Sequence, residues 1–295
     1  MKYFKRFQTQ QQFENFLNSE DYLEPNVSYI DEVDHIIKGM PKPISPLKFT
    51  AVQANSTIKL TRVGTNASNL SNAVLEYSTD GVVWNSYTLN TNITLSNVGD
   101  YVMFKGNNVS LGYDSNNYHK FVMTGTIKAS GDITSLNNGI GGDCILTNYC
   151  YEYMFLGCTA LTTAPALPAT TLAKYCYRCM FQNCTSLTSV PALPATTLAD
   201  SCYYRMFYRC TSLATAPELP ATTLVNSCYY QMFYNCTNLN YIKCLAIDVS
   251  ANNCLYNWVY NVSINGTFVK NSSATWTTTG VSGIPNGWTV QTAAA

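Results

Sequence analysis

The stretch CYYRMFYRCTSLATAPELPATTLVNS, residues 202–227, decides the fold because it recurs along the chain at a fixed period of 26 residues. Related copies begin at Cys150, Cys176 and Cys228, so four copies fill residues 150–253. A fixed period of about 20 to 50 residues is typical of proteins in which each unit buries its apolar face against its neighbours. The sequence therefore predicts a solenoid of four stacked repeats.

Each copy begins with a pattern that fits one face of a helix. The first, second, fifth, sixth and ninth positions keep their residue types, as in Cys202, Tyr203, Met206, Phe207 and Cys210. On an α-helix these positions form one stripe, so we expect a helix that faces the core. The buried rows would contain Cys150, Cys176, Cys202, Cys228, Cys158, Cys184, Cys210, Cys236, Met154, Met180, Met206 and Met232.

The rest of each copy predicts a short strand and a return segment. In the second copy, Leu187 to Val190 is extended, and Pro191 ends it because proline has no N–H to donate to a sheet. One helix and one parallel strand per repeat make the predicted fold class an α/β solenoid. We expect residues 254–295 to form its C-terminal cap, with Trp258, Trp276 and Trp288 as core residues.

The variable positions of the repeat are expected to face water or a partner. These are the third, fourth, seventh and eighth positions, and they include isolated carboxylates such as Glu152. Tyrosine and arginine anchor interfaces at low entropic cost, so the tyrosine- and arginine-rich positions are the candidate ligand contacts. They are Tyr204, Arg205, Tyr208, Arg209, Tyr230 and Tyr234.

The 12 cysteines are interpreted as buried, reduced thiols. Two cysteines eight residues apart on a helix lie about 12 Å apart at 1.5 Å per residue. A disulfide allows only roughly 4.4 to 6.8 Å between the two Cα atoms. Cys176, Cys179 and Cys184 resemble a metal site only weakly, since no histidine lies in the repeats. No metal or cofactor is predicted.

The order Met-Phe-x-x-Cys-Thr-Ser-Leu-Thr-x-x-Pro-x-Leu-Pro-x-x-Thr-Leu, residues 180–198, resembles the BspA-type leucine-rich repeats. These repeats occur on surface proteins of gut and oral anaerobic bacteria and in their bacteriophages. The resemblance covers roughly residues 144–290. It implies a solenoid with a parallel sheet on one side and a role in adhesion or host binding rather than catalysis.

The N-terminal half has a different composition and three expected parts. Residues 1–46 contain a predicted amphipathic helix over residues 3–17 and a proline-rich linker. The helix is expected either to fold onto its own domain or to serve as an anchor or oligomerising segment. Residues 47–128 alternate apolar and polar positions between turns, which predicts a small antiparallel β-sandwich-like domain. Residues 129–149 are expected to cap the solenoid at its N-terminal end.

The chain shows no pattern of residues that indicates catalysis. His35 and His119 lie in no motif with a nucleophile or a second metal ligand, and we expect both to be ordinary surface or turn residues. Seventeen Lys and Arg residues balance 17 Asp and Glu residues, and no basic patch suggests nucleic-acid binding. The sequence also predicts no export signal and no membrane span. A non-enzymatic role is therefore expected.

These observations favour a bacteriophage virion surface protein, a head or tail fibre or decoration subunit made in the host cytoplasm. Residues 1–46 would contact other virion structural proteins or form a homo-oligomer, and the repeats would bind a host cell-surface protein or glycan. One alternative is a BspA-like adhesin on a bacterial cell surface. Another is a carbohydrate-active enzyme with its site in residues 47–128.

Overall fold

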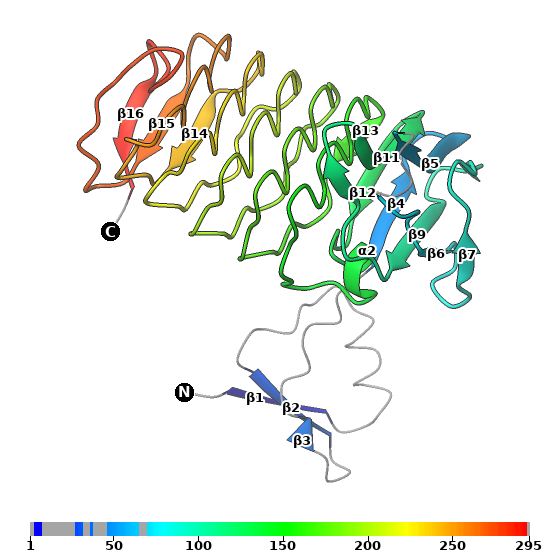
Figure 1. Cartoon of the computed structure of the whole chain (residues 1–295). Coiled ribbons are helices and arrows are strands. Elements are labelled where there is room, and N and C mark those ends of the chain that lie inside the picture. Colours follow the sequence, from blue (N-terminus) through cyan, green and yellow to red (C-terminus); the bar gives the residue numbers. More distant parts are fainter. Residues whose placement is uncertain (1–2, 8–26, 32–35, 38–45, 65–69, 294–295) are drawn as a thin grey trace. The chain divides into compact units, whose positions relative to one another are not determined.

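The computed structural model describes residues 3–7, 27–31, 36–37, 46–64 and 70–293 (Figure 1). The regular secondary structure of the described residues is nearly all β, with 30% strand and 2% helix. Most other described residues lie in turns or irregular segments. The only helix in the described residues is α2 (Ser135–Asn138), which has 4 residues. The chain divides into two compact units, Met1–Ser45 and Pro46–Ala295.

The first unit contains a three-stranded sheet with the strand order β1-β2-β3. Strand β1 (Tyr3–Phe7) runs parallel to β2 (Val27–Asp31), and β2 runs antiparallel to β3 (Ile36–Ile37). The helix predicted over residues 3–17 is therefore wrong for residues 3–7, whose aromatic residues suit a strand. Residues 8–17 lie outside the described part of the chain.

The second unit begins with two sheets that share one core, and their strands pair antiparallel except for the parallel pair β12–β13. Phe49, Phe104 and Phe121 are fully buried, and the Phe49 and Phe121 rings of opposite sheets lie 4.9 Å apart. One sheet has the order β10 (Gly112–Asp114), β11 (Asn117–Thr124), β5 (Ser56–Val63), β8 (Ile93–Leu95). The other has the order β13 (Leu161–Thr163), β12 (Ile127–Ser130), β4 (Leu47–Ala51), β9 (Tyr101–Gly106), β6 (Leu75–Ser78), β7 (Asn85–Tyr87).

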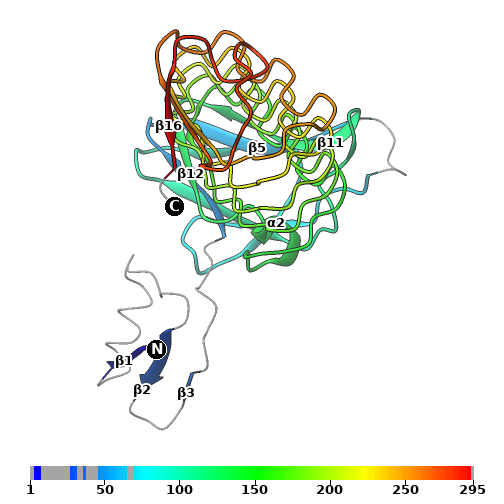
Figure 2. The same ribbon diagram turned by 90° about the vertical axis from the view of Figure 1, so that its left-hand side faces the viewer.

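The repeats follow as a stack of non-helical turns of chain, which we call rungs (Figures 1 and 2). Between Cys150 and Cys158, alternate residues donate their backbone N–H in two different directions. The N–H of Met154 bonds to the Tyr151 carbonyl in its own rung at 3.2 Å. The N–H of Phe155 bonds to the Met180 carbonyl in the next rung at 2.9 Å. Each rung is therefore a run of overlapping tight turns that is also hydrogen-bonded to its neighbour.

Every fourth residue in these turns has a positive φ. In the third rung they are Ser201 at 56°, Arg205 at 53° and Arg209 at 59°. A positive φ at the third residue of a turn lets the chain turn back, and glycine and asparagine tolerate it best. The eighth position of the repeat accordingly holds glycine or asparagine in four rungs, at Gly157, Asn183, Asn235 and Asn261, whereas the third rung has Arg209 there.

The predicted α/β leucine-rich-repeat solenoid is wrong. Residues 150–253 contain no helix, and β13 and β14 (Tyr241–Cys244) are the only named strands within them. A helix would bond each N–H to the carbonyl four residues earlier, whereas here the bonds within a rung span three residues and alternate with bonds between rungs. The inward spacing fits a four-residue turn period as well as a helical period.

The inward side chains stack from rung to rung as continuous aromatic columns. The rings of Phe155, Phe181, Phe207 and Phe233 lie 5.3 to 5.8 Å apart and within 4° of parallel. A second buried column contains Tyr151, Tyr177, Tyr203 and Tyr229. The cysteine and methionine rows lie beside these columns, and each of their members is at most 2% exposed along residues 150–236.

The ninth-position cysteines also tie neighbouring rungs together. The Cys184 thiol donates to the Phe155 carbonyl at 3.0 Å, and the Cys210 thiol donates to the Phe181 carbonyl at 3.1 Å. All 12 cysteines are free thiols, and burial raises the pKa of Cys158 and Cys236 to about 12. A small side chain with a weak donor therefore fits this position.

Both ends of the stack are covered by different structures. At the N-terminal end, the N–H groups of Leu111 and Phe121 bond to the carbonyls of Cys150 and Met154. The β10–β11 region thus takes the place of a preceding rung, and it shares one core with the repeats. At the C-terminal end, β14, β15 (Thr267–Lys270) and β16 (Thr289–Thr292) form a parallel sheet beside buried Trp258.

The turn geometry predicts the effect of removing an asparagine with a positive φ. Asn235→Ala should lower the free energy of unfolding by about 1 kcal/mol, because alanine disfavours the left-handed conformation. In a helix the same change would raise stability by a few tenths of a kcal/mol. Urea denaturation measures the difference, with Asn238→Ala as the exposed control at a position without a positive φ. Stabilisation by Asn235→Ala would contradict the turn geometry.

Candidate recognition surface

Two rows of partly exposed tyrosines run across the last three rungs, and we call them the tyrosine ridges. One ridge stacks Tyr204, Tyr230 and Tyr256, with ring centroids 4.5 and 4.9 Å apart. The other stacks Tyr208, Tyr234 and Tyr260, with centroids 4.9 and 4.6 Å apart. Tyr256 is 44% exposed and Tyr260 is 43% exposed. The ridges form because the third and seventh positions of the repeat hold tyrosine in consecutive rungs.

Arginines lie against these ridges. The Arg205 guanidinium carbon is 5.2 Å from the Tyr204 ring centroid and 5.4 Å from that of Tyr208, so it lies between the ridges. Its Nε donates to the Gln231 side-chain oxygen at 2.7 Å. The Arg209 carbon is 5.6 Å from the Tyr208 ring. Cation–π contacts of this kind hold flexible arginines in place.

The structure therefore brings all six sequence-predicted contact residues, Tyr204, Arg205, Tyr208, Arg209, Tyr230 and Tyr234, onto one surface. Sequence reasoning missed Tyr256 and Tyr260, because residues after 253 were treated only as a cap. The signal was present, since both occupy the third and seventh positions of a fifth turn that starts at Cys254.

A polar pocket of about 370 Å³ opens beside the first ridge, and we call it the Arg178 pocket. Arg178 occupies the third position of the second rung, where later rungs hold tyrosine. Its guanidinium carbon lies 5.4 Å from the Tyr175 ring and 5.3 Å from the Tyr204 ring. The pocket is lined by Asp114, Ser115, Tyr149, Tyr175, Arg178, Ser201, Tyr204, Asn226 and Ser227.

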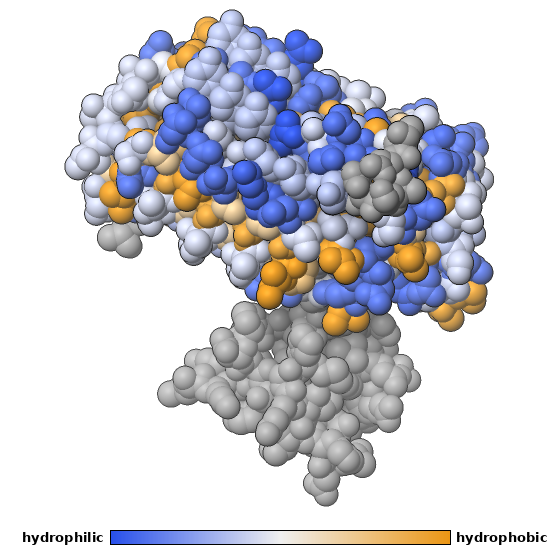
Figure 3. Space-filling model, in the orientation of Figure 1, coloured by the Kyte–Doolittle hydropathy of each residue, from blue (hydrophilic) through white to orange (hydrophobic). Residues whose placement is uncertain are grey.

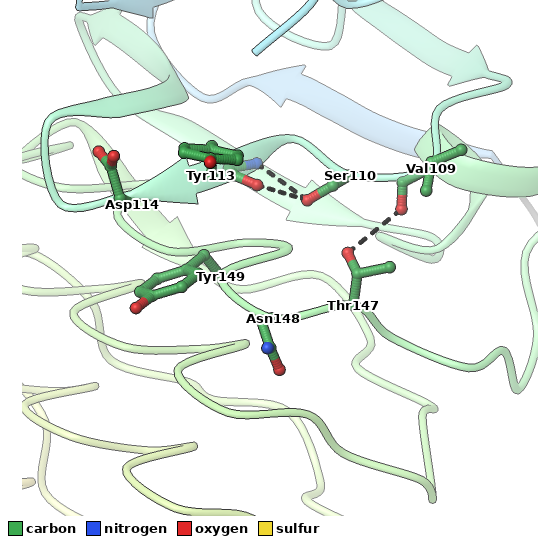
Figure 4. Close-up of a pocket in the computed structure, with 8 residues that line it drawn as sticks. Val109, Ser110, Tyr113, Asp114, Thr147, Asn148 and Tyr149 are labelled. Atoms are coloured by element: carbon green, nitrogen blue, oxygen red, sulfur yellow. Dashed lines mark hydrogen bonds between the residues drawn. The ribbon is translucent and has the colours of Figure 1, made fainter. Parts of the chain in front are cut away.

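A second hollow of about 550 Å³, the Tyr113 pocket, shares Asp114 and Tyr149 with the Arg178 pocket. Tyr113 comes from β10 and Tyr149 from the start of the first rung, and their rings flank the opening (Figure 4). A side chain at Gly112 would meet the Tyr149 carbonyl oxygen at 2.2 Å, so only glycine lets β10 approach the rung. Two hydrogen bonds hold Asp114 ionised, because the Asn116 N–H and the Asn117 amide keep its pKa below the usual range.

A third hollow follows the other side of the second ridge. It is a polar groove of about 450 Å³ formed by the eighth and tenth positions of successive rungs. Its walls are Gly157, Asn183, Arg209, Asn235 and Asn261 on one side and Thr159, Thr185, Thr211 and Thr237 on the other. The Asn261 amide donates to the Asn235 side-chain oxygen at 3.0 Å. Hydrophobic and hydrophilic residues are interspersed on the face of the second unit shown in Figure 3.

Three residues predicted to face outward are buried instead. Glu152 is 0% exposed, Cys179 is 2% exposed and Gln231 is 9% exposed. The four-residue turns direct the third and fourth positions along the rung surface, where side chains of neighbouring rungs cover these three residues. Gln231 accepts a hydrogen bond from Arg205, and Glu152 accepts one from Arg178.

Glu152 and Arg178 form an ion pair at this surface, and the pKa of Glu152 is shifted. The Glu152 carboxyl is fully buried, and its Oε2 atom has no hydrogen-bond partner. Burial raises the pKa of Glu152 to about 7, and Arg178 only partly offsets this. Arg178 is 23% exposed in its side chain and reaches the pocket. The Glu152 carboxyl can therefore gain or lose a proton near neutral pH, while Arg178 stays charged.

His119 is not the surface or turn residue that the sequence suggested. It lies on β11 and is 0% exposed. Its Nε2 accepts the Ala73 N–H at 3.2 Å, and its Nδ1 lies 3.1 Å from the Leu111 carbonyl. Burial lowers the pKa of His119 to about 4, which keeps the ring neutral. It therefore joins β11 to neighbouring segments, and His35 lies outside the described residues.

Cysteine, histidine and carboxylate side chains of the described residues form no group of three that could hold a metal ion. Within the same described ranges, no helix is long and apolar enough to span a membrane. Cys176 and Cys179 are both buried thiols of the second rung.

Comparisons with protein families, curated proteins and solved structures found no match. The function of the surface must therefore be argued from its own geometry.

The raised pKa of Glu152 makes stability depend on pH in a specific direction. Between its ordinary value of 4.5 and about 7, the folded chain holds a proton that the unfolded chain releases, so this group lowers stability as pH rises. Glu152→Gln removes this loss. The free energy of unfolding of the variant, minus that of the wild type, should increase from pH 5 to pH 8 by up to a few kcal/mol.

Taking this difference cancels the opposite effect of His119, which is present in both proteins. Urea denaturation at several pH values measures it. The control is Glu218→Gln, because Glu218 pairs with Lys243 on the exposed surface. A difference that stays flat with pH would contradict the assignment of Glu152.

Proposed function

We propose that this protein is a non-enzymatic recognition protein of a bacteriophage virion surface, which binds a host cell-surface glycan or protein through the tyrosine ridges. The observation that carries the proposal is the pair of stacked, partly exposed ridges with arginines held between and beside them. Tyrosine and arginine supply most of the binding energy in many interfaces.

The rigidity of the ridges supports a binding role. Each ridge tyrosine is stacked on at least one equivalent ring, and Tyr230 and Tyr234 are each held between two, so little side-chain entropy remains to be lost on binding. The ridges present ring edges and hydroxyl groups along one line, because neighbouring rings cover one another's faces. A sugar ring or an extended polar chain can lie along these edges while its hydroxyl groups bond to nearby amides.

The virion setting is supported by the repeat motif rather than by the fold. The motif resembles BspA-type repeats of bacterial and bacteriophage surface proteins, although the α/β architecture expected from that resemblance is absent. The proposal includes no catalytic step, and release of sugar from a host glycan by the purified chain would contradict it. A bacterial cell-surface adhesin would use the same ridges for binding.

The binding role predicts a strong effect of removing two ridge rings. The double variant Tyr208→Ala with Tyr234→Ala should bind host cells at least tenfold more weakly, because the second ridge loses two adjacent tyrosine rings with their hydroxyl groups. Flow cytometry with labelled protein measures the loss. The matched control is Thr196→Ala with Thr222→Ala, which changes two exposed residues at another position of the repeat. Unchanged binding by the tyrosine variant would move the contact surface elsewhere.

The virion role predicts where the protein is found and which part anchors it. Mass spectrometry should detect it in purified particles and not in washed cell envelopes. Removal of residues 1–45 should leave the second unit folded, because that unit begins at Pro46, but it should abolish incorporation into particles. Detection in envelopes alone would favour the adhesin, and normal incorporation would contradict the anchoring role.

A further inference from the structure

The stacking of the third repeat position is broken at one place, and that place is the Arg178 pocket. Glu152 and Arg178 occupy this position in the first two rungs, whereas Tyr204, Tyr230 and Tyr256 occupy it afterwards. A neutral stacking surface thus gives way to a charged pair at one end of the first ridge. The change of chemistry suggests a binding specificity that the ridges alone do not have.

Arg178 is placed to offer its charge to a ligand. Its side chain is fixed between the Tyr175 and Tyr204 rings, and both rings line the pocket with it. Among the described residues, its guanidinium makes one hydrogen bond, in which Nη1 donates to Glu152. The remaining guanidinium N–H groups are therefore free to bind a ligand oxygen, and a guanidinium matches the two oxygens of a carboxylate or sulfate.

Glu152 is the group whose charge would change when an anion arrives. Its Oε1 accepts from Arg178, and its Oε2 is buried without a partner. The groups that act on it are Arg178 and Asp114, together with Tyr118, Tyr153 and Cys179, which lie around Arg178 or the carboxyl. Arg178 is the cation that acts on Glu152, so Glu152 competes with an anionic ligand for its positive charge. Lys174 and Arg205 lie against the Tyr175 and Tyr204 rings and add positive charge near the pocket.

A proton on Glu152 ends this competition. The neutral carboxyl no longer compensates Arg178, and an anion in the pocket in turn favours the proton because like charges repel. Binding and protonation therefore strengthen each other. The direction agrees with the effect of burial on Glu152, which already favours its neutral form.

We propose that the Arg178 pocket binds the anionic group of an acidic sugar and that binding is coupled to the uptake of one proton by Glu152. The sugar ring would lie against Tyr175 and Tyr204, and its hydroxyl groups would reach Ser201, Asn226 and Ser227. This inference rests on the proposed recognition function and names the class of glycan. No bond forms or breaks, and the proton comes from water or buffer.

Calorimetric titration of the full chain tests the proposal with three probes: N-acetylneuraminic acid, galactose 6-sulfate and neutral galactose. At least one acidic sugar should bind about tenfold or more tightly at pH 5.5 than at pH 8.5, and galactose should not show this dependence. Binding of N-acetylneuraminic acid would identify a carboxylate as the anionic group, and binding of galactose 6-sulfate would identify a sulfate. Titration in two buffers of different ionisation enthalpy should show net uptake of a fraction of a proton at pH 8.5 and almost none at pH 5.5, where Glu152 is already protonated.

Two variants separate the coupling from simple charge attraction. Glu152→Gln mimics the protonated carboxyl, so it should bind the acidic sugar equally well at both pH values and take up no proton. Arg178→Gln should lose acidic-sugar binding at every pH, and Glu218→Gln, a surface control, should behave as the wild type. Circular dichroism confirms that each variant is folded before titration.

The inference is overturned if neither acidic sugar binds at pH 5.5, or if the pH dependence survives in Glu152→Gln. Wild-type protein that adheres to host cells but binds neither acidic sugar would refute only this inference. Wild-type protein that binds an acidic sugar while the tyrosine-ridge variant keeps full adhesion would refute the proposed role of the ridges and leave the pocket standing.

Discussion

The structure depends on backbone hydrogen bonds that alternate between two directions along each rung. One N–H closes a turn within the rung, and the next N–H reaches the carbonyl of the following rung. The backbone N–H groups from Cys150 to Cys158 all have carbonyl partners, although the segment is neither a helix nor a regular strand. Buried backbone groups need such partners. The geometry depends on a positive φ at every fourth residue, which costs about 1–2 kcal/mol at a residue that is not glycine. The stacked apolar columns and the hydrogen bonds between rungs offset this cost.

Such a stack needs a different surface at each end, and the chain supplies both. The first rung accepts hydrogen bonds from Leu111 and Phe121, which belong to the sheets before the repeats. The Phe121 and Phe155 rings are stacked 5.5 Å apart, so the phenylalanine column starts inside those sheets. At the other end Trp258 covers two columns at once, and its indole N–H bonds to the Gly283 carbonyl at 2.8 Å. Residues 47–128 thus serve as a cap for the stack as well as a β structure.

The sequence predicts the 26-residue period and the inward residue types, but not the backbone that places them there. Inward positions 1, 2, 5, 6 and 9 fit a period of 3.6 and a period of 4 equally well over nine residues. Gly157 and Asn183 at the eighth position were the signal for turns, because glycine and asparagine favour positive φ. The burial of Glu152 and His119 could not be predicted, because it depends on side chains from the next rung and from a neighbouring strand. The tyrosine candidates were found because the exterior of a repeat is free to vary, so aromatic residues there stand out.

The free variation of the outward repeat positions also explains how the recognition surface arises. When consecutive rungs carry the same residue at one position, that residue stacks on itself, which produces the tyrosine ridges from Tyr204 onward. When the residue changes between rungs, the stack opens and a pocket forms, as it does where Tyr204 meets Arg178. Substitutions at a single outward position therefore change the shape and charge of the surface without changing the hydrogen bonds that build the rung. A chain of this kind can acquire a new ligand at one rung while the others preserve the fold. Glu152 shows the limit, because burial raises the pKa of a carboxyl placed there to about 7 even with an arginine in the next rung.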